Sequence, residues 1–423
     1  MGFASAYLEQ RALFPEIIKE APDKNTGIVI VIPAYNEPGI RKLLDSLALC
    51  KEPPCQVEIL VILNAPEDAT ADILKSNVTC HDQIESWKKE NTDCFFRLFA
   101  FLAPPLKGWG VGLARKTGMD EATRRFNTIN NPEGIILNLD ADCLVAENYF
   151  TSVYYGFKED KDRSACSIYF EHPLEGNEFP EKIYEYISLY ELHLRYYYQG
   201  LAYTGYPYVF HTVGSAIAVK ALPYVKAGGM NRRQAGEDFY FIQKLVPAGG
   251  YFSITSTTVY PSPRPSFRVP FGTGASIARL SETGESNLYS YNFNAFKDLK
   301  SFFGITETLF QAESETLPAI YDKLPVGLKT FLPEEEFISK IAEIQGNTSG
   351  LSSFQKRFFG WFNMFKVVKY LNFVHLEMYE KKPVQVSALE LLEEKSIIPE
   401  SKEPRELLHI YRKLEKKSFT NLH

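Results

Sequence analysis

The sequence predicts an α/β fold in which a mixed, Rossmann-like sheet carries helices on both faces and is followed by a helical region. Three observations support this prediction. Continuous apolar runs rich in β-branched residues occur at 27–33, 57–63 and 134–139, as is typical of strands that are buried on both faces. Apolar residues at helical spacing separate these runs. From about residue 290 the composition shifts to helical patterns rich in Phe, Lys and Glu.

The expected elements follow in order from the N-terminus. A helical lead-in precedes the first strand at 27–33, and apolar positions from Ile40 to Leu47 predict a helix before the second strand at 57–63. Together they form a βαβ unit. A strand, a helix and a strand are then expected, at residues 97–102, 112–126 and 134–139. This part therefore predicts an open, mostly parallel sheet whose ligands bind at the carboxyl ends of its strands.

The middle of the chain is expected to be mixed and its end helical. Residues 165–170 predict a strand, and Pro180 opens a Tyr-rich helix that runs to about Gln199. The charged runs after Lys381 are typical of solvated helix faces. The predicted organisation is a helical lead-in, an α/β domain and a helical accessory region, at residues 1–26, 27–290 and 291–423.

Bulk composition excludes several classes of function and location. The 46 Lys plus Arg against 52 Asp plus Glu give no basic excess for nucleic-acid binding, and the six cysteines form no CxxC pair, so reduced thiols are expected. Charges near the N-terminus argue against a signal peptide. Lys366 and Lys369 interrupt the apolar window at 358–379, which falls short of a membrane span. We therefore expect a cytoplasmic protein. Its aromatic C-terminal stretch packs within the fold, the favoured interpretation, or lies on the inner face of a membrane.

Two carboxylates, Asp140 and Asp142, follow the strand at 134–139 with one residue between them. At a strand end both can lie at the carboxyl edge of the sheet, where their oxygens suit Mn²⁺ or Mg²⁺ bound to a diphosphate. The alternative for so short a motif is a turn in which the Asp side chains bond to the backbone. Local sequence leaves these two interpretations equally open.

Basic residues accompany two Gly-containing segments. Lys107 and Arg115 flank a loop that leads into a helix, where close backbone approach and the helix N-terminus favour a phosphate group. A plain turn is the commoner meaning of such a pattern. Arg264 and Arg268 lie in a proline-stiffened loop that can close over a diphosphate and exclude water. A surface loop with solvated arginines fits that sequence equally well.

Glu237 and Asp238 stand side by side before a helical apolar pattern. Acids in the first turn of a helix are favoured by its dipole, so a capping role competes with a role in acid–base chemistry. His211 precedes a segment of small residues at 213–219. A lone histidine is more often structural, although an imidazole also suits a third metal position or a contact to an acceptor.

Taken in order, these motifs resemble those of family 2 glycosyltransferases with the GT-A fold, of the bacterial, non-processive type. The resemblance extends over roughly residues 27–275 and depends on an ordered set, which is more specific than any one motif. The set includes a Pro-Ala-Tyr-Asn-Glu turn after the first strand, the paired carboxylates and the Glu-Asp pair. The Gln-x-x-Arg-Trp motif of processive, membrane-bound members is absent, which favours an enzyme that adds a single sugar.

The resemblance implies a nucleotide-sugar site at the strand ends. It implies that Pro33, Tyr35 and Glu37 hold the nucleoside. Asn64 stands where the family usually has an Asp that reads the base, so the base stays open, with a UDP-sugar favoured and a GDP-sugar as the second choice. The Gly-rich segment, the paired carboxylates and the proline-stiffened loop complete the expected donor contacts with Lys107, Arg115, Asp140, Arg264 and Arg268.

The resemblance also implies the metal and catalytic roles. Asp140 and Asp142 are expected to hold Mn²⁺ or Mg²⁺, with His211 as the candidate third ligand. Asp238 is the expected general base on the acceptor hydroxyl, while Glu237 orients that hydroxyl or the sugar.

We therefore expect an inverting, metal-dependent glycosyltransferase that moves a hexose-type sugar to a hydroxyl of a glycan, a lipid-linked or a small-molecule acceptor. Two alternatives stay open. A nucleotidyltransferase that makes nucleotide sugars has a similar sheet, but it typically opens with a Gly-rich, Arg- and Lys-bearing loop, unlike residues 33–37 here. A non-catalytic sugar- or nucleotide-binding protein predicts erosion of the four acids, all of which are present.

Overall fold

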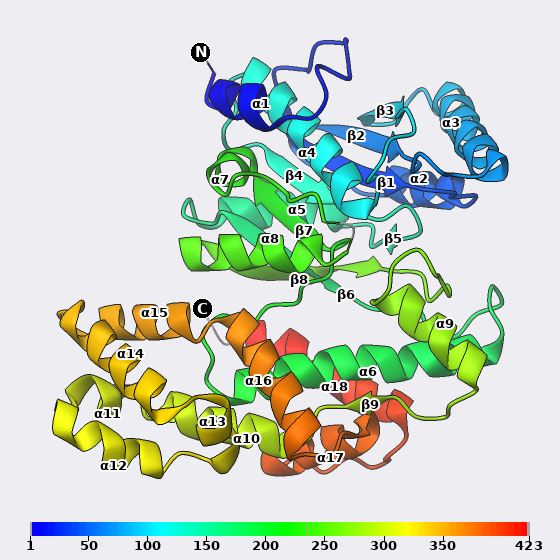
Figure 1. Ribbon diagram of the computed structural model, residues 1–423. Helices are drawn as coiled ribbons and strands as arrows, with labels where there is room; N and C mark the ends of the chain where they lie inside the picture. Colours follow the sequence, from blue (N-terminus) through cyan, green and yellow to red (C-terminus); the bar gives the residue numbers. More distant parts are fainter. Residues whose placement is uncertain (1, 234, 421–423) are drawn as a thin grey trace. The chain divides into compact units, whose positions relative to one another are not determined.

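The computed structural model describes residues 2–233 and 235–420. The chain forms two compact units, and each of them contains two stretches of sequence (Figure 1). The three consecutive domains expected from the sequence, at residues 1–26, 27–290 and 291–423, stay a prediction. The units are Met1–Gly176 with His211–Ser276, and Asn177–Phe210 with Ile277–His423.

The first unit is built on one eight-stranded sheet, whose strands are β1 (Thr26–Ala34), β2 (Gln56–Leu63), β3 (Phe96–Leu102), β4 (Ile135–Asn138), β5 (Leu144–Val145), β6 (Ala165–Phe170), β7 (Ile217–Lys220) and β8 (Tyr251–Tyr260). Their order across the sheet is β3-β2-β1-β4-β7-β6-β8-β5. The first four are parallel, which confirms the parallel half predicted from the apolar runs. β7 is antiparallel to its neighbours β4 and β6, so the sheet as a whole is mixed.

β1 lies at the centre of the parallel half because it is apolar on both faces. Every residue from Ile28 to Ala34 is buried, and burying one Val or Ile side chain contributes about 1.5–3 kcal/mol. Its register pairs Ala34 with Leu63 and Val31 with Asn138. The carboxyl ends of β1, β2 and β4 therefore meet at one edge of the sheet, where the predicted site residues follow.

Helices cover both faces of the sheet, as predicted (Figure 1). α1, α4, α7 and α8 share one core with Val29 and Val31 of β1, while the alternate residues of the strand face the opposite side. On that side α3 contacts β3, α5 contacts β8 and α2 packs on α3. The helices of this unit are α1 (Ser5–Arg11), α2 (Ile40–Ala48), α3 (Ala71–Glu90), α4 (Val111–Thr128), α5 (Tyr149–Lys158), α7 (Ala221–Lys226) and α8 (Glu237–Leu245).

The second unit is helical, which confirms the predicted C-terminal helical region. Its long helix α6 (Glu181–Tyr203) contacts α17 and α18, and a short antiparallel pair joins β9 (Tyr289–Ser290) to β10 (Lys382–Pro383). α9 (Thr273–Thr283) begins in the first unit and continues into the second. The remaining helices are α10 (Phe293–Gly304), α11 (Thr306–Gln311), α12 (Leu317–Asp322), α13 (Val326–Phe331), α14 (Glu334–Gly346), α15 (Leu351–Trp361), α16 (Met364–Glu377), α17 (Val384–Glu394) and α18 (Pro404–Thr420).

Ion pairs are buried inside this helical unit. Arg195 of α6 donates to Glu191 at 2.8 Å and to Glu415 of α18 at 2.6 Å. Arg412 of α18 forks onto the same Glu191 carboxylate at 2.8 and 2.7 Å. Because a buried charge is costly unless it is paired, these contacts fix α18 on α6. Among the described helices, none is both long and apolar enough to cross a membrane.

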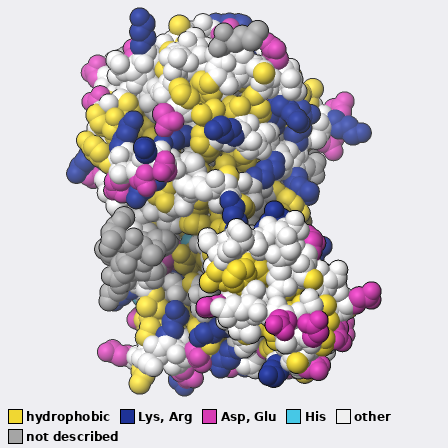
Figure 2. Space-filling model, turned by 90° about the vertical axis from the view of Figure 1, so that its left-hand side faces the viewer, with side chains coloured by type: hydrophobic (Ala, Val, Ile, Leu, Met, Phe, Trp, Pro, Cys, Tyr) yellow, Lys and Arg dark blue, Asp and Glu magenta, His cyan; other side chains and the backbone are white. Residues whose placement is uncertain are grey.

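The surface carries charges of both signs. On the face shown in Figure 2, Lys and Arg side chains alternate with Asp, Glu and apolar groups. This mixture agrees with the formal net charge of -6.

Candidate active site

The turn after β1 is held by a helix that the sequence did not predict. Asn36 adopts a left-handed backbone conformation, with φ of 49°, which Asn tolerates better than most residues. Its N–H donates to Oδ1 of Asn77 at 3.0 Å, and Nδ2 of Asn77 donates to the carbonyl of Asn64 at 2.9 Å. One buried amide on α3 therefore joins the turns that follow β1 and β2.

Glu37 is the anionic centre of the first turn. Its side chain is 3% exposed, and it accepts two hydrogen bonds from the fork of Arg264, at 3.1 and 2.6 Å. Arg268 lies 3.7 Å from the same carboxylate. Arg268 also donates to the Asn36 carbonyl at 3.1 Å and lies 5.7 Å from the centre of the Tyr35 ring. Two arginines from the proline-stiffened loop therefore cover the turn.

Asp142 shares Arg264 with Glu37. Nη2 of Arg264 donates to Oδ2 of Asp142 at 3.1 Å. Burial, and after it the neighbouring Asp140 carboxylate, raise the pKa of Asp142 from 3.8 to about 6, although Arg264 opposes this rise. Negative charge is therefore crowded at the carboxyl end of β4, where Asp142 and Glu37 share the Arg264 guanidinium.

Asp140 belongs to a second ion-paired group, centred on Arg115. The guanidinium of Arg115 is 4% exposed and donates to Oδ1 of Asp140 at 2.5 Å through Nη2 and to Glu237 through Nη1. Burial lowers the pKa of Arg115, but the carboxylates of Asp140 and Glu237 reverse this effect and raise it. The guanidinium is therefore charged and links the end of β4 to the start of α8.

Asp238 lies beside Glu237 in the first turn of α8. Its Oδ1 accepts from the N–H of Phe239 at 2.7 Å. Burial raises the pKa of Asp238, against the opposing charge of Arg115. Burial also raises the pKa of Glu237. A carboxylate with a raised pKa is a stronger base, which suits proton abstraction near neutral pH.

Four further residues were predicted for the site but do not belong to the ion-paired groups around Arg264 and Arg115. Pro33 is buried in β1, opposite Ile62 of β2. Asn64 is buried, and its N–H donates to the Ala34 carbonyl at 3.0 Å. Lys107 is exposed in the loop before α4. The His211 ring packs edge-to-face on Phe170 at 5.1 Å, and its carbonyl accepts from Ser167 at 2.8 Å.

Lys116, the residue after Arg115 on α4, has structural partners. Its ammonium donates to Asp120 at 2.7 Å and to the Tyr7 hydroxyl at 3.2 Å. Asp120 also accepts from the hydroxyls of Tyr7 and Tyr224, at 2.8 and 2.7 Å. This buried network fastens α1 and α7 to α4, so Lys116 serves the fold of this face.

The paired carboxylates suit a divalent metal ion by their chemistry. The side chains of Asp140 and Asp142 are 35% and 32% exposed, and carboxylate oxygens are the donors that Mg²⁺ and Mn²⁺ prefer. A cation there would offset the burial and the neighbouring Asp140 charge that raise the pKa of Asp142. Within residues 2–233 and 235–420, however, no three His, Cys, Asp or Glu side chains gather as a metal-binding group. His211 therefore stays a prediction as third ligand.

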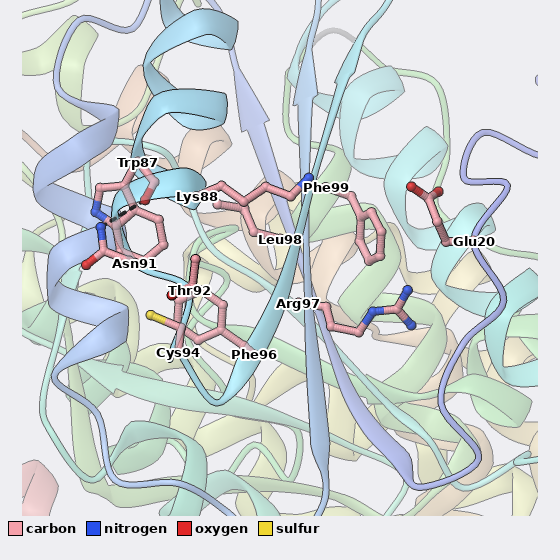
Figure 3. A pocket seen from close by; sticks show the side chains of 10 residues that line it. All are labelled: Glu20, Trp87, Lys88, Asn91, Thr92, Cys94, Phe96, Arg97, Leu98 and Phe99. Carbon is pink, nitrogen blue, oxygen red and sulfur yellow. Dashed lines mark hydrogen bonds between the residues drawn. The ribbon is translucent and has the colours of Figure 1, made fainter.

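A pocket of about 240 Å³ lies away from these residues. It is formed at the amino end of β3 and the carboxyl end of α3, as Figure 3 shows, and Lys88, Arg97 and Phe99 are among its lining residues. Arg97 is paired with Glu58 and with the Ala21 carbonyl. This pocket contains none of the predicted site residues.

Comparison with known families identifies the strand-rich part of the chain. Residues 29–220 match the family model described as Glycosyl transferase family 2. This match begins within β1 and ends with β7, so it includes Glu37, Asn64, Arg115 and both Asp140 and Asp142. No curated protein sequence matches the chain.

Two solved structures illustrate the more distant likenesses. TarS 1-349 of S. aureus in complex with UDP-GlcNAc is 13% identical, with 78% of this chain and 89% of that chain covered and a TM-score of 0.41. The mannosyltransferase PcManGT of Pyrobaculum calidifontis, in complex with GDP-Man and Mn2+, is 14% identical, with 98% and 92% covered and a TM-score of 0.36. A TM-score below 0.5 does not establish a shared fold, so the assignment depends on the family model.

Proposed function

Because residues 29–220 place this chain in glycosyl transferase family 2, we propose that it moves a hexose-type sugar from a nucleoside diphosphate to an acceptor hydroxyl, with inversion and with the help of a divalent metal ion. The chain is thus a glycosyltransferase, and its donor, metal and stereochemistry are the proposal. We propose a UDP-sugar as donor before a GDP-sugar, a cytoplasmic location, and a glycan, lipid-linked or small-molecule acceptor.

One observation carries this proposal. Five carboxylates from three segments converge at the carboxyl edge of the sheet, where Arg115 and Arg264 pair with four of them. The acids Glu37, Asp142 and Asp140 follow β1 and β4, and Glu237 begins α8 with Asp238 beside it. This arrangement offers a cation-binding end and a basic carboxylate within one connected cluster.

The end formed by Glu37, Asp142 and Arg264 fits the donor. Asp140 and Asp142 would hold a divalent cation, which supplies charge neutralisation to a departing nucleoside diphosphate. Arg264 and Arg268 stand on a loop beside Tyr35 and Glu37, and guanidinium groups bind phosphate oxygens in forked geometry. Arg264 would exchange its carboxylate partners for the diphosphate when the donor binds.

The end formed by Glu237 and Asp238 fits the acceptor. Asp238 would accept the proton of the attacking hydroxyl, and its raised pKa suits that role. Glu237 is already fixed by Arg115, so it would orient the hydroxyl or the sugar. Attack by a hydroxyl on the anomeric carbon as the diphosphate leaves is a single displacement, which inverts that carbon.

Calorimetric titration with UDP and with GDP, each with and without Mn²⁺, tests the donor site. We expect one nucleotide to bind in a metal-dependent way, because the paired carboxylates and the diphosphate would share the cation. Asp142→Ala should weaken this binding by about 100-fold, as expected for loss of a charged ligand worth about 3 kcal/mol. Asp93→Ala, an exposed acid outside the site, is the matched control.

Two results would contradict the donor site. Equal binding with and without Mn²⁺ would remove the metal from the proposal. No binding of either nucleotide at millimolar concentration would remove the donor site itself.

A further inference from the structure

We propose that Arg115 is a positioning residue that fixes the acceptor-side acids against the donor-side carboxylate, and that it does not bind the donor phosphates. This inference rests on the proposed function and assigns a different role to a residue expected from the sequence to contact the donor. It is carried by the partners of Arg115, by its burial and by two glycines packed around it.

The two arms of the Arg115 guanidinium are directed to different parts of the site. Nη2 donates to Oδ1 of Asp140, at 2.5 Å, and Nη1 donates to Glu237. Asp140 follows β4 and Glu237 is the first residue of α8. The guanidinium therefore joins the acid that follows β4 to the acid that begins α8.

Burial prevents the same guanidinium from serving a phosphate group. Arg115 is 4% exposed, and its partner Glu237 is 2% exposed. Nε of Arg115 is also buried and has no hydrogen-bond partner in the described part of the chain. Phosphate contacts in a site that binds and releases substrate need accessible donors, which this side chain does not present.

Two glycines make this closeness possible. A Cβ on Gly214, in the loop before β7, would lie 2.2 Å from Nη1 of Arg115. A Cβ on Gly112, in the first turn of α4, would lie 2.1 Å from the Arg233 carbonyl and 3.0 Å from Cβ of Glu237. The start of α8 thus packs closely against the start of α4, and the Arg115 guanidinium is enclosed beside them.

The chemical consequence concerns Asp238. Because Glu237 is held by Arg115, the next residue Asp238 has a fixed place at the head of α8. The same guanidinium holds Asp140. Arg115 therefore fixes the position of Asp238, the proposed base, relative to Asp140 on the donor side. A Lys in place of Arg115 has a single charged nitrogen and cannot engage both acids as a fork does.

The test is a set of variants with kcat and KM measured separately. We expect Arg115→Lys to lower kcat by about 100-fold, the scale of a misplaced reacting group, while the KM of the donor changes by no more than about 3-fold. Gly214→Ala should lower kcat in the same way, because its Cβ displaces the guanidinium without removing the charge. Since it leaves Arg115 in place, it also guards against an Arg115 variant that fails to fold.

A double-mutant cycle separates positioning from direct contact. If Arg115 acts through Glu237, Arg115→Lys with Glu237→Gln should be no more than about 3-fold worse than the poorer single variant. The matched control is Arg125→Lys, which alters another buried arginine of α4 whose partner is Glu58. It should lower thermal stability and leave kcat unchanged.

The outcomes distinguish this inference from the proposed function. Two results would overturn the positioning role alone, provided that the wild-type protein turns over a nucleotide sugar. One is a loss of kcat in the double variant equal to the product of the losses in the two single variants. The other is a raised KM for the donor in Arg115→Lys with kcat retained. A wild-type protein without turnover on any nucleotide sugar overturns the proposed function and the positioning role together.

Discussion

At the scale of single residues, the carboxylates of the site outnumber the arginines that pair with them. Arg264 bonds to both Glu37 and Asp142, and Arg268 lies 3.7 Å from the Glu37 carboxylate. Burial and the nearby Asp140 raise the pKa of Asp142 to about 6. The ligand-free protein therefore holds a carboxylate under conditions that disfavour its charge, and a cation would relieve this cost.

We predict that Asp142→Asn stabilises the ligand-free protein at neutral pH. The pKa of Asp142 is about 6 when folded and about 3.8 when unfolded. Between these values the folded state binds the additional proton, so the free energy of unfolding of the wild type falls as pH rises. Asn cannot ionise and avoids this fall. The gain in free energy of unfolding of the Asn variant over the wild type should level off above pH 6 at about 1–2 kcal/mol. The full pKa difference corresponds to roughly 3 kcal/mol, and we expect less because about a third of the Asp142 side chain is exposed to solvent.

Urea unfolding in metal-free buffer checks this prediction at about pH 4 and about pH 7.5. The gain of the Asn variant over the wild type should be small at the lower pH and present at the higher one. Asp160→Asn changes an exposed acid and should show no such growth. An Asp142→Asn protein that is no more stable than the wild type at the higher pH would show that the carboxylate is not disfavoured.

The residue scale also shows what the sequence could reveal of the site. Acids after a buried strand and at the start of a helix were identifiable from spacing, because strand ends and helix N-termini have recognisable local patterns. The partners of the arginines were not identifiable. Arg115 bonds to residues 25 and 122 positions away, and Arg264 bonds to one 227 positions away, so no local pattern contains them.

At the scale of elements, strands β1, β2, β3, β4 and β6 were predicted from the sequence, whereas strands β5, β7 and β8 and helices α3, α5 and α7 were not. β1 and β2 are mostly apolar and buried along most of their length, which is a strong signal for strands buried on both faces. α3 buries only Asn77, Cys80, Ile84 and Trp87. Polar Asn77 occupies the first of these helically spaced positions, so the apolar periodicity is weak and the helix that clamps both strand-end turns is difficult to recognise.

This clamp gives a prediction for α3. Asn77→Ala removes the two hydrogen bonds to Asn36 and Asn64, each worth about 0.5–1.5 kcal/mol. If the turns hold the nucleoside, the affinity for the bound nucleotide should fall by about 10-fold while the fold is retained. Isothermal calorimetry and thermal unfolding measure the two effects.

A matched control lies at the other end of the same helix. Asn91 also donates from its amide to a backbone carbonyl, that of Trp87, but it contacts neither turn. Asn91→Ala should leave nucleotide affinity unchanged. Equal affinities for the wild type and Asn77→Ala would show that the clamp does not shape the nucleoside site.

At the scale of the whole molecule, the division into units follows contacts that composition does not reveal. The shift to helical patterns near residue 290 was visible in the sequence, whereas the grouping of α6 with the C-terminal helices was not. The partners of Glu191 and Arg195 of α6 include Arg412 and Glu415 in α18. These ion pairs join segments more than 200 positions apart in sequence, as the separations of 220 and 221 show.

The central claim for the molecule is catalysis with Asp238 as the base. The most direct measurement is release of nucleoside diphosphate from a panel of UDP- and GDP-sugars with Mn²⁺, comparing the wild type with Asp238→Asn. Asp82→Asn, an exposed acid on α3, is the control. We predict turnover of at least one donor by the wild type and the control, and a loss of about 100- to 10,000-fold in Asp238→Asn. Turnover by Asp238→Asn at the wild-type rate would contradict the assignment of Asp238 as the base. If the wild type released no nucleoside diphosphate from any donor, the assignment of the protein as a glycosyltransferase would itself be contradicted.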